Sequence, residues 1–135
     1  MLVLLLRSLL TVPMLITESF AKHFAQDWIE SWNAHDLSRV LAHYDDEFEM
    51  SSPRIVQIFN EPSGVLKGKA LVAAYWQKAL GLMPNLKFTL LGVYAGATSL
   101  AIHYSNERGG YASEVFTFDD SGKVIRAAAN YKISL

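Results

Sequence analysis

Residues 28–52 read WIESWNAHDLSRVLAHYDDEFEMSS, and this stretch decides the fold of the chain. It predicts the end of one amphipathic helix, a short second helix capped by Asp36, an acidic turn and a first strand. Aromatic side chains recur at every fourth position along the first helix, namely Phe20, Phe24, Trp28 and Trp32. Side chains four residues apart share one helix face, so this helix presents an aromatic stripe to the core. The second helix is expected to carry Leu37, Val40, Leu41 and Tyr44.

Downstream, the pattern changes from helices to strands. Residues 53–67 (PRIVQIFNEPSGVLK) are irregular, and 54–59 are consistent with a short strand or with a loop. Residues 68–83 predict a third helix. Four strands joined by tight turns then form an antiparallel meander that reaches the end of the chain. Helices first and strands second predict an α+β domain, with three helices on one face of a curved, mainly antiparallel sheet.

Alternation along the strands assigns an inner and an outer face to this sheet. In the third long strand Glu114, Phe116 and Phe118 share one side, which we expect to face the helices. In the last strand the small residues Ala127 and Ala129 face the same way and leave room for a cavity. Glu114 is therefore a carboxyl group among aromatic side chains. We expect either a functional acid in a pocket, or a buried carboxylate satisfied by Arg54, a tyrosine or a tryptophan.

The first sixteen residues, MLVLLLRSLLTVPMLI, form an apolar segment ahead of a single domain over residues 17–135. Arg7 interrupts the apolar run, no small-residue cleavage site follows, and a membrane span needs about 20 apolar residues. We expect a short arm or helix packed on this domain or on a neighbour, with no transmembrane span. We expect a cytoplasmic location, with export as the alternative if residues 1–16 act as a signal.

Composition excludes several classes of function. The net charge is −1 and the basic residues are scattered, which argues against binding to nucleic acid. There is no cysteine, so thiol chemistry and cysteine metal sites are excluded. The four histidines lack the spacing of metal ligands, and His43 is at most a residue of the pocket rim. We expect neither a metal nor a cofactor.

Three segments together resemble the SnoaL-like, ketosteroid-isomerase-like branch of the nuclear transport factor 2-like superfamily. They are WNAHDLSRVLAHYDDEFEMSSP, GVLKGKALVAAYW and EVFTFDDSGKVIRAAANY. The resemblance covers roughly residues 18–133 and implies a cone-shaped, cystatin-like roll with a cavity between helices and sheet, often dimeric through the outer sheet face. The family's activities are diverse, so the resemblance names no reaction.

The resemblance also suggests roles for individual residues. Ser52 falls where ketosteroid isomerases have their aspartate base, and a serine cannot remove a proton from carbon without a separate base. Trp28 falls at the oxyanion-hole tyrosine, and Glu114 falls at the second oxyanion carboxylic acid and keeps that group. Two of three positions therefore depart, which argues against steroid isomerisation. Other pocket positions implied by the resemblance or by the strand faces are Tyr44, Arg54, Tyr75, Trp76, Ile102, Tyr104, Phe116, Ala129 and Tyr131.

The sequence thus favours binding of a small, largely apolar or carbonyl-containing molecule, without assured catalysis. A first alternative is a lyase, isomerase or cyclase that acts on a hydrophobic carbonyl substrate with Glu114 as acid or base. A second is a protein-interaction scaffold. Arg54 suits a carboxylate or phosphate group of a ligand, or is a solvated loop residue. A homodimer is expected through the outer sheet face, which carries Ser113, Val115, Thr117, Arg126, Ala128 and Asn130.

Overall fold

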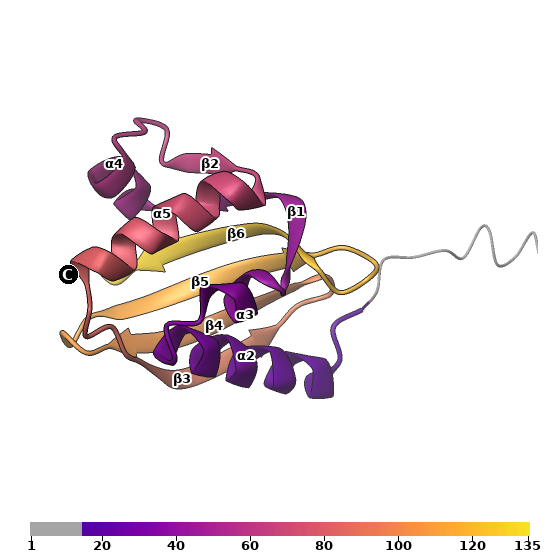
Figure 1. The fold of residues 1–135 in the computed structure, drawn as a ribbon. Helices are drawn as coiled ribbons and strands as arrows, with labels where there is room; N and C mark the ends of the chain where they lie inside the picture. The colour runs from indigo at the N-terminus through magenta and orange to yellow at the C-terminus, as the bar shows by residue number, and fades with distance from the viewer. Residues whose placement is uncertain (1–14) are drawn as a thin grey trace, which may run out of the picture.

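Helices fill the first part of the described chain and long strands fill the second (Figure 1). The computed structural model describes residues 15–135, so the arm expected at residues 1–16 lies almost wholly outside the described residues. The helices are α2 (Glu18–Asn33), α3 (Leu37–Leu41), α4 (Pro53–Phe59) and α5 (Lys69–Leu82). The strands are β1 (Tyr44–Ser51), β2 (Val65–Lys67), β3 (Phe88–Ala95), β4 (Ser99–Asn106), β5 (Tyr111–Phe118) and β6 (Val124–Tyr131). None of the described helices is long and apolar enough to cross a membrane.

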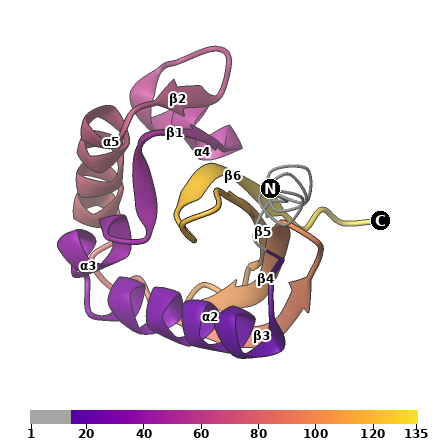
Figure 2. The same ribbon diagram turned by 90° about the vertical axis from the view of Figure 1, so that its right-hand side faces the viewer.

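The six strands form one mixed sheet in the order β2-β1-β6-β5-β4-β3. Strands β3 to β6 are the expected antiparallel meander, and β1 adds to it by pairing parallel with β6, with Met50 opposite Ala127. The sheet curves, and α2, α3 and α5 lie along its concave side (Figure 2). The predicted α+β architecture is confirmed.

Helix α2 is fixed at both ends by side chains of its own sequence. The Thr17 hydroxyl accepts a hydrogen bond from the Phe20 backbone N–H at 3.0 Å, which caps the first turn. At the other end, Asn33 donates to the Phe88 carbonyl at 2.9 Å and accepts from the Phe88 N–H at 2.7 Å. These bonds align the end of α2 with the start of β3, and Trp28 and Trp32 on the same helix are buried against the sheet.

Two local predictions are wrong. The second helix ends at Leu41, and Tyr44 is the first residue of β1. This segment pairs with β6, because the Val124 N–H donates a hydrogen bond to the His43 carbonyl at 2.9 Å. Residues 53–59 form a helix rather than a strand or loop. Ser52 caps that helix by accepting from the Arg54 N–H at 3.1 Å, and Pro53 supplies the first helical φ angle.

The strand alternation agrees with the expected faces. Glu114, Phe116 and Phe118 are buried between sheet and helices, whereas Val115 is exposed on the other side. Phe24 of α2 meets Phe116 and Phe118 edge to face, with ring centroids 4.9 and 5.0 Å apart. The aromatic stripe of α2 therefore packs directly on the inner residues of β5, and the core fills one end of the roll.

Candidate functional site

A cavity opens at the other end of the roll, between α2, α4, α5 and the inner face of the sheet. The volume of this cavity is about 60 Å³. An engineered cavity that holds benzene measures about 150 Å³, so a ligand of that size must extend through the mouth or displace side chains. The lining is mainly aromatic and apolar: Trp28, Trp32, Met50, Ser52, Arg54, Tyr75, Trp76, Ala79, Met83, Leu86, Phe88, Tyr104, Asn106, Arg108, Glu114, Ala129 and Tyr131.

Glu114 is the one acidic side chain in this lining, and it is only 4% exposed. The Tyr104 hydroxyl donates a hydrogen bond to its Oε1 at 3.2 Å. Its Oε2 has no hydrogen-bond partner within residues 15–135. This oxygen is not fully enclosed by protein atoms, so it is open to the cavity that Glu114 lines. Burial raises the pKa of Glu114 from 4.5 to about 7, because an apolar environment disfavours the charged form, and the bond from Tyr104 lowers it only in part.

Burial and the charge of this carboxyl group raise the pKa of three tyrosines in the lining. Burial, and then the neighbouring Glu114 charge, raise the pKa of Tyr104 well above its usual value. Burial is also the main cause that raises the pKa of Tyr75 to about 12 and that raises the pKa of Tyr131, and Glu114 adds to both shifts. These hydroxyls are therefore neutral hydrogen-bond donors over the physiological pH range.

Arg54 lies on the first turn of α4 and is half-buried in the cavity wall. Its Nη1 lies 3.6 Å from the Met83 Sδ, and its guanidinium carbon lies 4.8 Å from the centroid of the Tyr131 ring. Of the partners considered for a buried Glu114, a tyrosine is present in Tyr104, whereas no ion pair with Arg54 forms within the described residues. A cation and an ionisable acid thus line one cavity without neutralising each other.

The structure brings most of the expected pocket residues together. The residues that line the cavity as expected are Trp28, Ser52, Arg54, Tyr75, Trp76, Tyr104, Glu114, Ala129 and Tyr131. Tyr44, Ile102 and Phe116 do not line it, because they are fully buried in the packed core instead. Tyr44 is also engaged there, since its hydroxyl accepts a hydrogen bond from the Trp28 Nε1–H at 3.0 Å. The Trp28 N–H is therefore already used and is no free donor for a ligand, contrary to the role that the resemblance implied.

Sequence reasoning missed several lining residues. Met50 alternates inward on β1 and could have been found from the strand pattern, as Trp32 could from its place on the aromatic stripe. Leu86 and Phe88 enter the lining because Asn33 and His35 fix the start of β3, with the His35 Nε2 2.8 Å from the Leu86 carbonyl oxygen. Ala79 and Met83 were also missed, although they follow Tyr75 and Trp76 at helical spacing and share their helix face. The remaining missed residues, Asn106 and Arg108, lie at the end of β4 and in the turn after it, where no periodic pattern indicates their direction.

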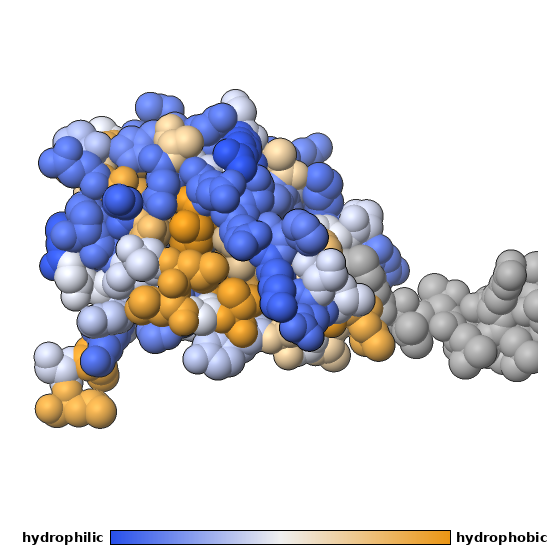
Figure 3. All heavy atoms as spheres, turned by 90° about the horizontal axis from the view of Figure 1, so that it is seen from below, coloured by the Kyte–Doolittle hydropathy of each residue, from blue (hydrophilic) through white to orange (hydrophobic). Residues whose placement is uncertain are grey.

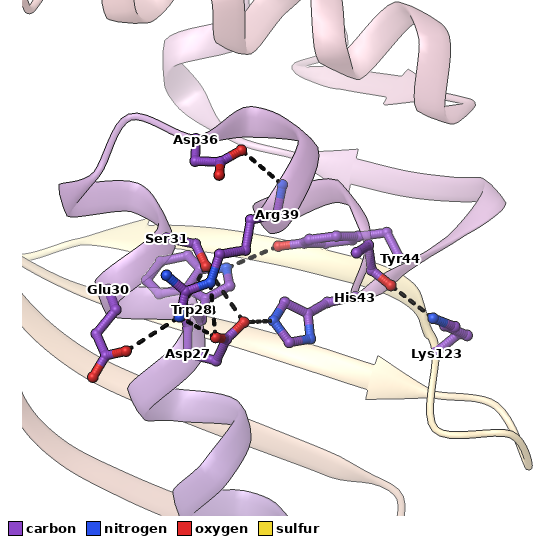
Figure 4. Close-up of polar contacts among 10 residues, drawn as sticks. Asp27, Trp28, Glu30, Ser31, Asp36, Arg39, His43, Tyr44 and Lys123 are labelled. Carbon is purple, nitrogen blue, oxygen red and sulfur yellow. Dashed lines mark hydrogen bonds and ion pairs between the residues drawn. The ribbon is translucent and has the colours of Figure 1, made fainter.

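A second polar cluster lies outside the cavity, where α2 meets the segment between α3 and β1 (Figure 4). Its centre is Asp27, whose Oδ2 lies 2.6 Å from the His43 Nε2 and whose Oδ1 accepts from the Arg39 guanidinium, with 3.0 Å to Nε. The Ser31 hydroxyl donates to the Asp27 carbonyl at 2.5 Å. His43 therefore belongs to this cluster rather than to the pocket rim. No group of three His, Asp or Glu side chains in residues 15–135 is placed to hold a metal ion.

A curved mixed sheet closed by helices around a small aromatic cavity defines the cystatin-like class of α+β domains. The model of the SnoaL-like domain family matches residues 25–132, and the chain belongs to this family. The predicted resemblance is confirmed. The crystal structure of a SnoaL-like protein of unknown function from Burkholderia thailandensis is 50% identical, with a TM-score of 0.84 over 88% of this chain and 99% of that chain.

Two more distant solved structures share the fold. An NTF2-like protein from Cytophaga hutchinsonii is 10% identical, with a TM-score of 0.65 over 83% of this chain and 89% of that chain. A protein with a cystatin-like fold from Methylobium petroleophilum is 16% identical, with a TM-score of 0.70 over 90% of this chain and 81% of that chain. No curated protein matches the chain.

Proposed function

We propose that this protein binds a small, largely apolar molecule in the aromatic cavity, with the Glu114 carboxyl group as the polar anchor. One observation carries the proposal, namely a buried carboxyl group with one oxygen open to the cavity. Burying an ionisable group without a charged partner costs stability. Ionisable groups that are buried at such a cost and have a perturbed pKa are concentrated at functional sites. A ligand that hydrogen-bonds the open oxygen would offset this cost.

Tryptophan fluorescence tests the proposal directly, because all three tryptophans of the chain, Trp28, Trp32 and Trp76, line the cavity. We expect a screen of small aromatic and carbonyl compounds to yield ligands that change this fluorescence. Glu114→Gln should weaken their binding by about tenfold, the effect of one altered buried hydrogen bond. Glu49→Gln is the matched control, since Glu49 lies on the same sheet but is 45% exposed. Unchanged affinity in Glu114→Gln, or no ligand at all, would contradict the proposal.

Acid–base catalysis on a hydrophobic carbonyl substrate is a second candidate. The pKa of Glu114 near 7 favours it, because a general acid or base works best when its pKa is close to the working pH. Ser52 offers no separate base, since its hydroxyl accepts the Arg54 N–H as the cap of α4. Glu114 with Tyr104 would then supply the whole proton-transfer machinery. Turnover of a carbonyl compound should show an apparent pKa near 7 and vanish in Glu114→Gln, and turnover that persists there would exclude this role.

We also propose a homodimer through the outer sheet face around Val115, which the described helices leave uncovered. A second apolar area lies on the underside of the domain, where α2 and the edge strand β3 run (Figure 3). Leu91 of β3 is 47% exposed. Sedimentation of Val115→Lys and Leu91→Lys separates the two surfaces. We expect only Val115→Lys to yield monomer. A monomeric wild-type protein at micromolar concentration, or dissociation by Leu91→Lys alone, would contradict the proposal.

A further inference from the structure

Arg54 differs from every other arginine in the part of the chain that the structure describes. Residues 15–135 contain four arginines, and three of them have a carboxylate partner: Arg39 has Asp27, Arg108 has Glu107 at 2.6 Å, and Arg126 has Glu49 at 3.8 Å. Arg54 has none among the described residues, although it is half-buried. Residues 1–14 contain no Asp or Glu, so no acidic side chain in them supplies the missing partner.

The surroundings of Arg54 hold the guanidinium group without neutralising its charge. Two neutral acceptors lie next to the group. One is the Met83 Sδ at 3.6 Å, a weak acceptor, and the other is the Tyr131 hydroxyl, whose bond to Arg54 offsets part of the burial that raises the pKa of Tyr131. The guanidinium carbon lies 4.8 Å from the centroid of the Tyr131 ring, and neither this ring nor the Met83 sulfur supplies a negative charge. A planar, pre-positioned guanidinium in a cavity wall is suited to bidentate pairing with a carboxylate.

Three other N–H donors of the lining are not free to bind a ligand. The indole N–H of Trp32 has no hydrogen-bond partner in residues 15–135, but protein atoms enclose it fully, so it is not open to a ligand. The Trp28 N–H is taken by Tyr44, and the Arg108 guanidinium is paired with Glu107. Glu114 is the one carboxyl acceptor, and its neutral form at pH values below about 7 donates as well. Arg54 is thus the charged donor of the lining that has no carboxylate partner within residues 15–135, and a ligand that pairs with it must bring acceptor atoms.

We propose that the cavity ligand is a compact monocarboxylic acid whose carboxylate pairs with Arg54 and whose apolar body lies against the aromatic walls. This rests on the proposed binding function and adds the chemical class of the ligand. A singly charged carboxylate suits the site better than a phosphate dianion, because a second negative charge in the same cavity as Glu114 is repelled once that group ionises. The small volume of the cavity favours an acid with a short or single-ring body.

Matched pairs of acids and primary amides provide the test: butyrate with butyramide, benzoate with benzamide, and phenylacetate with phenylacetamide. Each pair has nearly the same shape and differs in charge. Binding is measured by the fluorescence of the three tryptophans at about pH 6 in the wild-type protein, Arg54→Gln, Arg54→Lys and Arg126→Gln. Arg126 is 64% exposed on β6, so Arg126→Gln is the control for a general loss of positive charge. Melting curves check that each variant is folded.

At least one acid should bind the wild-type protein about tenfold to a hundredfold more tightly than its amide, as a charge-assisted bidentate pair requires. Arg54→Gln should abolish this preference, so that acid and amide bind with similar affinity, Arg54→Lys should keep part of it, and Arg126→Gln should keep all of it. If amides bind as well as acids, or if Arg54→Gln retains the preference, the inference fails while the binding function stands. If no acid and no amide binds and the wider screen is also negative, both fail.

Discussion

Two buried or half-buried carboxyl groups, Asp27 and Glu114, lie in opposite kinds of environment in this small domain. Asp27 accepts hydrogen bonds from Arg39 and from His43, and although burial alone would raise its pKa, these partners outweigh burial and lower it. Glu114 has the Tyr104 hydroxyl alone, and burial raises its pKa to about 7. One carboxylate is satisfied by the protein, and the other keeps an oxygen open to a cavity.

The difference separates a structural charge from a candidate functional one. The Asp27 cluster joins α2 to the segment before β1, so its partners come from the elements that it holds together (Figure 4). Glu114 joins no such elements through a charge pair, and neither arginine of the cavity lining, Arg54 or Arg108, is paired with it. Stability alone explains Asp27, whereas the arrangement at Glu114 costs stability and supports the proposed role of this carboxyl group as a ligand anchor.

The largest effect is expected from Glu114→Gln on the pH dependence of stability. The folded-state pKa of Glu114 is raised from 4.5 to about 7, so its contribution is fully present below about pH 4.5 and is lost as the pH rises through 7. The free energy of unfolding of the wild-type protein should fall by up to about 3 kcal/mol across this window relative to Glu114→Gln. Urea denaturation between about pH 4 and 8 measures the difference. If the free energy of unfolding depends on pH in the same way in the wild-type protein and in Glu114→Gln, the proposed contrast between Glu114 and Asp27 is wrong.

Asp27→Asn should have a smaller effect with the opposite dependence on pH. The pKa of Asp27 is lowered from 3.8, so its contribution is present above about pH 3.8 and disappears as the pH falls through the lowered value. Because Asp27 and Arg39 are both about a third or more exposed, we expect a loss of only about 1 to 2 kcal/mol at neutral pH. Asp46→Asn is the control, as its 89% exposed carboxylate lies 3.5 Å from Lys69. Equal losses in both variants would show that the cluster has no special role.

Tyr44→Phe should have the smallest effect of the three. It removes the hydroxyl that accepts the Trp28 N–H and leaves a buried donor unpaired, at a cost of about 1 kcal/mol of folding stability. Because Tyr44 does not line the cavity, ligand affinity should change by less than about twofold. Chemical denaturation and fluorescence titration with the same screened ligand test both statements. A loss of affinity as large as that of Glu114→Gln would place Tyr44 in the site after all.

Much of the fold could be predicted from periodicity, because burial imposes it on the sequence. The aromatic stripe of α2 and the alternation along β5 both follow from side chains that face one core. The segment at residues 53–59 could not be assigned in this way, since it is short and half-exposed, and its helix depends on the local cap at Ser52. Tyr44 was assigned to the wrong element because strand pairing with Val124, a contact distant in sequence, overrides a continuing helical pattern.

The candidate site was accessible to sequence reasoning only in part. Inward alternation is enough to place Glu114 among aromatic side chains, and the cavity lining includes Tyr104 and Tyr131 for the same reason. The hydrogen-bond partners follow from three-dimensional packing, and no pattern indicates that Trp28 uses its N–H on Tyr44 or that Arg54 lacks a carboxylate. Arg108 lines the cavity because a hairpin turn carries it there, which depends on tertiary structure alone.

The ionisation of Glu114 is the property on which the proposed binding site depends most. Carbon-detected NMR can follow its side-chain carboxyl resonance through a pH titration, with Glu114→Gln to assign the signal. The structure predicts a titration midpoint at about pH 7. The chemical shifts of the Tyr104 ring should change with the same midpoint, because the Tyr104 hydroxyl donates a hydrogen bond to Glu114. A midpoint at or below the ordinary value of 4.5 would mean that the carboxyl group is solvated or paired, and would contradict the assignment of Glu114 as the anchor of a ligand.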